Sequence, residues 1–91
     1  MQGFYKYTHI NTNTTTTIPA VVLCGALTVN SLGSGGNTAT VYDGDTSGPV
    51  IATVNTTTAQ GTFLWDAFVK NGSVTVVTTG GVAADLTISS Y

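Results

Sequence analysis

With 91 residues, 42% of them hydrophobic and 7% charged, and a net charge of −2, the chain is too apolar for disorder and too poor in Lys and Arg to bind a phosphate backbone. Nineteen residues are Thr, 11 are Val, and Arg and Glu do not occur. Because β-branched residues favour strands and most good helix formers are scarce, this composition predicts one all-β domain over residues 1–91.

The first third of the chain predicts short extended segments separated by polar stretches. A strand is expected from Phe4 to Ile10. The polar stretch 11–17 fits two alternatives, a Thr-rich strand or an extended arm that reaches a neighbouring subunit. Residues 20–24 form an apolar run, which we expect Gly25 to break before residues 26–32 continue as a strand.

A hairpin is predicted in the middle of the chain, because the strand-like segments 38–42 and 50–54 flank the turn sequence DGDTSGP. Asp43 and Asp45 in this turn are the best candidate metal ligands, since carboxylates one residue apart in a loop can bind calcium. The full EF-hand loop is absent, which favours the alternative of an Asx-type turn. We therefore predict that the protein binds no metal and no cofactor, and we keep Asp43 and Asp45 as weak candidate metal ligands.

The cleanest alternation follows, with Phe63, Trp65, Ala67 and Val69 on one face of a strand. This pattern predicts Trp65 in or near the core. Asn71–Gly72 favours a tight turn, and short strands are expected at 74–77 and 85–89.

Seven to nine strands without a helix predict an antiparallel β-sandwich. A jelly-roll-like order is favoured, and an immunoglobulin-like sandwich is the alternative. The chain lacks the Cys–Trp–Cys framework of immunoglobulin domains, since Cys24 is its single cysteine. We expect Cys24 to be buried as a small hydrophobic residue.

Residues suited to catalysis are few. His9 is the single histidine, and no GxSxG motif occurs, so we predict that the protein is not an enzyme. The apolar run around Cys24 has about half of the roughly twenty residues that a membrane span requires. The N-terminus lacks the apolar stretch of a secretory signal, so we expect neither a membrane partner nor secretion.

Aromatic residues are the candidates for contact with a partner. Tyr5 and Tyr7 would share one face of the first strand with His9. Tyr and Trp are enriched at interfaces because they combine an apolar body with a polar tip. Tyr5, Tyr7 and Trp65 are therefore candidate contact residues, although the two tyrosines can equally pin the first strand to the core.

The chain contains the strings YKYTHI, at 5–10, and TATVYDGDTSG, at 38–48, together with the closing aromatic strand, the Asn–Gly turn and the final TISSY. In these features the chain resembles small structural proteins of tailed phages and their prophages. This resemblance implies a virion protein, assembled in the host cytoplasm, that decorates the capsid. Such a protein docks on the major capsid protein, commonly as a homotrimer, and cements neighbouring capsomers. The alternatives are a tail or fibre component that touches host glycans, and a free-standing lectin-like module.

Overall fold

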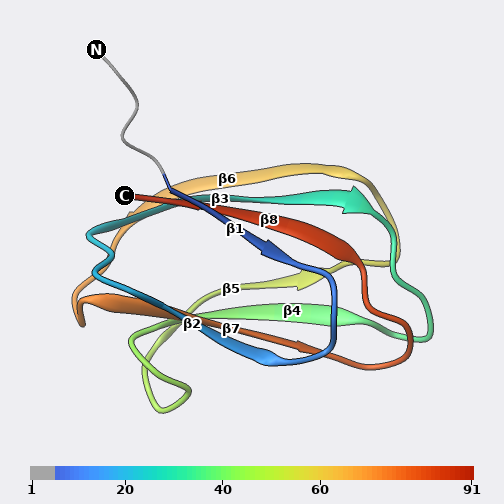
Figure 1. The fold of residues 1–91 in the computed structure, drawn as a ribbon, viewed down its shortest axis with the longest axis horizontal. Helices are drawn as coiled ribbons and strands as arrows, with labels where there is room; N and C mark the ends of the chain where they lie inside the picture. The colour runs from blue at the N-terminus through green and yellow to red at the C-terminus, as the bar shows by residue number, and fades with distance from the viewer. Residues whose placement is uncertain (1–5) are drawn as a thin grey trace.

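The computed structural model describes residues 6–91, which fold into eight strands. In chain order these are β1 (Lys6–Ile10), β2 (Thr15–Pro19), β3 (Leu23–Ser31), β4 (Thr38–Asp43), β5 (Val50–Asn55), β6 (Gly61–Phe68), β7 (Ser73–Thr79) and β8 (Asp85–Ser90). They form two antiparallel four-stranded sheets, with the orders β1-β8-β3-β6 and β2-β7-β4-β5, which lie as two layers in Figure 1. The predicted all-β sandwich is confirmed.

The strands pair in a nested order, β4 with β5, β3 with β6, β2 with β7 and β1 with β8. β8 also pairs with β3, and β7 with β4, which completes the two sheets. The chain thus forms one long hairpin with its turn between β4 and β5, and both of its arms pass back and forth between the two sheets. This order fits the jelly-roll-like prediction. The immunoglobulin-like alternative does not fit, because it places the first two strands in one sheet, whereas β1 and β2 lie in different sheets.

The core lies between the two layers and consists of aliphatic side chains from their inner faces. Its largest fully buried hydrophobic members are Val21, Leu27, Val29, Val41, Val74, Val76, Leu86 and Ile88. Burial of each contributes roughly 1.5–3 kcal/mol relative to an exposed side chain. Residues 6–91 include no helix that is long and apolar enough to cross a membrane.

In the first third of the chain, the structure corrects the expectation for Gly25 and places part of the stretch 11–17 in a strand. Gly25 does not end a strand, because β3 continues through it, and the register against both neighbouring strands shifts there instead. The missing side chain makes this glycine compatible with a bulge inside a strand. Of the polar stretch 11–17, residues 15–17 belong to β2 and pair with β7. Phe4 and Tyr5, with which the first strand was expected to begin, lie outside the described residues.

A buried asparagine fastens the loops at one end of the sandwich. Asn37 is fully buried, and its Nδ2 donates hydrogen bonds to the Asn13 side chain at 2.8 Å and to the Gly80 carbonyl at 2.8 Å. Its Oδ1 accepts from the Thr56 hydroxyl and from the Ala84 amide. One side chain thereby joins four separate loop segments, which satisfies polar groups that would be costly to bury unpaired.

Candidate functional site

The outer face of the sheet β1-β8-β3-β6 carries a row of side chains that differ greatly in size. The register places Tyr7 opposite Ser89, Ser89 opposite Ala26, and Ala26 opposite Leu64. Residues paired across strands share one face, so all four side chains project to the same side. Tyr7 is 77% exposed and Leu64 is 71% exposed. The row therefore has a large apolar group at each end and small groups in the middle.

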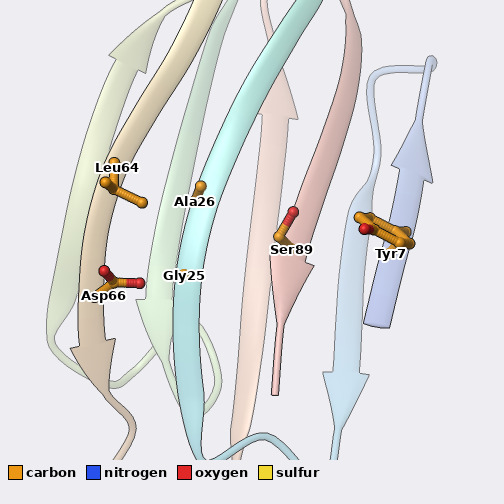
Figure 2. A pocket seen from close by; sticks show the side chains of 6 residues that line it. All are labelled: Tyr7, Gly25, Ala26, Leu64, Asp66 and Ser89. Atoms are coloured by element: carbon orange, nitrogen blue, oxygen red, sulfur yellow. The ribbon is translucent and has the colours of Figure 1, made fainter. Parts of the chain in front are cut away.

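This difference in size leaves a depression of about 310 Å³ in the middle of the sheet. Figure 2 shows its floor, formed by Gly25, Ala26 and Ser89, with Tyr7 on β1 at one rim and Leu64 and Asp66 on β6 at the other. The aromatic ring, the carboxylate and the serine hydroxyl can each contact a ligand or a protein surface. The depression is open, so it can accept a protruding side chain or a sugar ring.

Asp66 lies on this rim beside a bulge in β6. The pairing of β3 with β6 shifts register at Gly25, which stands opposite Trp65 and Asp66. Asp66 adopts a φ of +44°, a left-handed conformation that Asp tolerates better than most residues. Such bulges re-aim side chains in an edge strand. Here, however, alternation along β6 is kept across the bulge, so Trp65 is directed inward and the Asp66 carboxylate lies on the same side as Leu64.

The apolar surface continues beyond the bulge to Phe68. Its neighbour Ala67 pairs with the buried Cys24, so Phe68 points to the outer face. Phe68 is 80% exposed, the highest exposed fraction among the large hydrophobic residues that the structure describes. We refer to Tyr7, Ala26, Leu64 and Phe68 together as the apolar face.

The outer face of the other sheet is different. It presents Thr15, Thr17, Thr40 and Thr53, with the half-buried Tyr42 and Val77 between them. We refer to these four threonines as the hydroxyl face. Val50 is the single exposed large hydrophobic residue in the strands of this sheet, whereas the strands of the first sheet expose Tyr7, Phe63, Leu64 and Phe68. The part of the first sheet's outer face around Tyr7, Leu64 and Phe68 is thus more apolar than the outer face of the other sheet.

Of the three candidate contact residues, Tyr7 lies on the apolar face and Tyr5 lies outside the described residues. Trp65 is half-buried on the inner side of β6, where it packs against the core, as the alternation predicted. Its Nε1 donates a hydrogen bond to the Cys24 sulfur, 3.3 Å away. Burial raises the pKa of the Cys24 thiol, and the bond from Trp65 lowers it by a smaller amount.

Of the two candidate metal ligands, Asp43 is the last residue of β4 and Asp45 lies in the loop that follows, and backbone amides donate hydrogen bonds to both carboxylates. Asp43 is 6% exposed, and its two oxygens accept hydrogen bonds from the amides of Lys70 and Asn71 at 2.9 and 3.0 Å. Asp45 accepts one from the Ser47 amide at 2.9 Å, as in an Asx-type turn. Within residues 6–91, no three His, Cys, Asp or Glu side chains converge as a metal site requires.

His9 takes part in a polar cluster in the sheet β1-β8-β3-β6. Its Nε2 lies 2.8 Å from Oδ1 of Asp85, and Nδ2 of Asn30 donates to the same oxygen at 2.9 Å. These two hydrogen bonds, first that from Asn30 and then that from His9, lower the pKa of Asp85. Asn30 also donates to the Thr87 hydroxyl, so this cluster joins β1, β3 and β8.

No protein-family model and no curated protein matches this sequence.

Sequence reasoning identified Tyr7 but missed Leu64, Asp66 and Phe68, which form the other rim of the depression and its extension. The signal was present, because the side of the 63–70 segment opposite Trp65 carries two large hydrophobic residues. On a half-exposed strand that side should be polar, and large apolar residues there indicate a binding surface.

Proposed function

We propose that this chain is a structural protein of a tailed-phage virion, a capsid decoration protein that docks on the outer shell and stabilises the junctions between capsomers. The observation that carries the proposal is the contrast between the apolar face and the hydroxyl face. The sequence strings at 5–10 and 38–48, which resemble those of small phage structural proteins, support the same assignment.

The apolar face supplies what a docking surface needs. Tyr7 and Phe68 offer rigid aromatic contact area, and such residues are enriched in the buried centres of interfaces. The depression between Tyr7 and Leu64 can receive a protruding side chain of the shell. The hydroxyl face can remain in water, because threonine hydroxyl groups are solvated without a formal charge.

In this role the partners are the major capsid protein and further copies of the chain, arranged as a homotrimer. A decoration protein acts in many copies, so a modest affinity at each site becomes a high overall avidity for the shell. The protein needs no catalytic group and no cofactor for this work, which consists of burying surface across a junction.

The second candidate is a tail or fibre component that binds a host glycan. The lining of the depression favours it, since an aromatic ring, a carboxylate and a hydroxyl are groups that contact sugars. No Lys lines the depression, so a neutral sugar fits it better than an anionic one.

Co-sedimentation with capsid shells that lack the protein tests the leading proposal. We expect the protein to sediment with the shells at micromolar concentration and to delay their rupture on heating. The Tyr7→Ala variant should bind about tenfold more weakly, as expected for loss of an aromatic anchor. Thr53→Ala on the hydroxyl face is the matched control and should bind as the parent does.

An absence of shell binding at micromolar protein would overturn this proposal. Shifts of the Tyr7 ring resonances on titration with neutral oligosaccharides, combined with a failure to bind shells, would favour the glycan-binding candidate.

A further inference from the structure

β6 is the outermost strand of its sheet, so one of its edges pairs with no other strand of the described residues. A free edge presents unpaired backbone groups to any other strand, and proteins protect such edges with Lys, Pro, bulges or short strands. The edge strand β1 contains Lys6, β2 ends with Pro19, and β5 directly follows Pro49. At eight residues β6 is the longest of the four edge strands, and it contains neither Lys nor Pro. Its single protecting feature is the bulge at Asp66, which leaves residues 61–64 in regular register with β3.

Large apolar side chains lie on both faces of this open segment. Leu64 projects to the outer face, while Phe63, which pairs with the buried Leu27, points to the inner side and remains 38% exposed. Beside Phe63 and Trp65, a groove of about 520 Å³ runs along the open side of the sandwich between β6 and β5. Ala52 and Val54 of β5 form its opposite wall. A segment that adds to β6 would therefore meet apolar surface on both of its faces.

We propose that the β5–β6 side of the sandwich is the surface through which two copies of this chain associate, with the edge of β6 as its centre. The occupant that fits is an extended strand with large apolar side chains on both faces. Among the four edge strands, β6 itself is the one with that pattern, since β1, β2 and β5 carry mostly polar exposed side chains. A second copy thus supplies both the backbone groups and the apolar surface that this edge lacks.

The low charge of the chain is compatible with a second copy as the occupant. Only six of the 91 side chains carry a formal charge at pH 7, so two copies approach each other with little electrostatic repulsion. Asp66, the one charged residue of β6, lies at the bulge, beyond the segment 61–64. Leu64 lines both this surface and the depression beside Tyr7, whereas Phe63, Trp65 and the β5 residues line this surface alone. The inference rests on the edge of β6 and does not depend on the proposed docking to a shell.

Light scattering behind a sizing column, from micromolar to millimolar protein, tests the inference. The parent chain should give twice the 9.3 kDa mass of one chain. Leu64→Lys places a charge in the contact and should weaken association by roughly a hundredfold or more. Thr15→Lys, on the edge strand of the other sheet, is the matched control and should leave the mass unchanged.

Two further measurements keep the test decisive. Trp65 is the single tryptophan and lines the groove, so its emission should shift to longer wavelength when the parent is diluted but not when Leu64→Lys is diluted. If Leu64→Lys does not fold, Thr62→Lys adds the charge at an exposed position without removing an apolar group. A parent that is monomeric at every concentration, or an oligomer that survives both β6 variants, would overturn the inference. Both results are masses of the protein without shells, so neither decides whether the Tyr7 surface binds a shell.

Discussion

The indole of Trp65 donates a hydrogen bond to the sulfur of Cys24, which joins the edge strand β6 to the buried part of β3. Cys24 is fully buried, and burial raises the pKa of its thiol, so little reactive thiolate exists at neutral pH. We expect a disulfide reagent to modify Cys24 only as fast as the protein opens, and rapidly once denaturant has unfolded it. Rapid modification of the folded protein would show that β6 separates readily from β3.

The second prediction concerns Asp43, whose carboxylate joins the end of β4 to the β6–β7 loop. Asp43→Ala leaves the amides of Lys70 and Asn71 without their acceptors, so it should lower the free energy of unfolding by about 2–4 kcal/mol in urea denaturation. Asp45→Ala removes one exposed bond and should cost less than about 1 kcal/mol. A clear rise in melting temperature on adding calcium would instead favour the metal-site interpretation of both residues.

Removing the hydroxyl group of Ser90 should stabilise the protein. Ser90 is fully buried in β8, and among the described residues its Oγ is the one buried side-chain polar atom without a hydrogen-bond partner. An unpaired buried hydroxyl costs about 1–3 kcal/mol, so Ser90→Ala should raise the free energy of unfolding by about 1 kcal/mol. Its neighbour Ser89, which lies on the outer face, provides the control, and Ser89→Ala should change stability little. A loss of stability in Ser90→Ala would mean that the hydroxyl has a partner in solution.

The fourth prediction is a pH dependence that arises from Asp85. Its pKa in the folded protein is lowered from the ordinary value of 3.8 by Asn30 and His9, so the ionised carboxylate stabilises the fold above that pH. This contribution disappears as the pH falls through the lowered pKa. The stability difference between the parent and Asp85→Asn should therefore be present at pH 6 and vanish toward pH 2. Asn30→Ala should reduce this stability difference. A stability difference that stays constant between pH 6 and pH 2 would exclude Asp85 as its source.

The local elements were predictable from the sequence, because strand periodicity and turn residues act over a few neighbouring positions. The β4–β5 hairpin follows from its Asp–Gly turn, and the inward direction of Trp65 follows from alternation. The nested order of strand pairs could not be predicted from the sequence. For example, β1 pairs with β8, and no local sequence pattern connects two segments so far apart in the chain.

Bulges explain the remaining differences between expectation and structure. Gly25 was expected to end a strand, whereas it shifts the register within one. The side of β6 on which Asp66 lies follows from alternation, which groups it with Leu64 and Phe68, whereas the left-handed φ of Asp66 does not follow from it. The directions of the Tyr7 and Asp66 side chains were therefore predictable, whereas the depression between them depends on a pairing of β1, β8, β3 and β6 that no local pattern specifies.

The position of β8 between β1 and β3 has a consequence for synthesis in the cell. This central strand is the last of the eight to leave the ribosome, so its sheet stays split into two parts until residues 85–90 have appeared. Until then, the inner faces of β1 and β3 and the strand edges beside the gap are open to other nascent chains. A stop codon before Asp85 should consequently produce aggregates that cellular proteases remove, rather than a smaller folded domain.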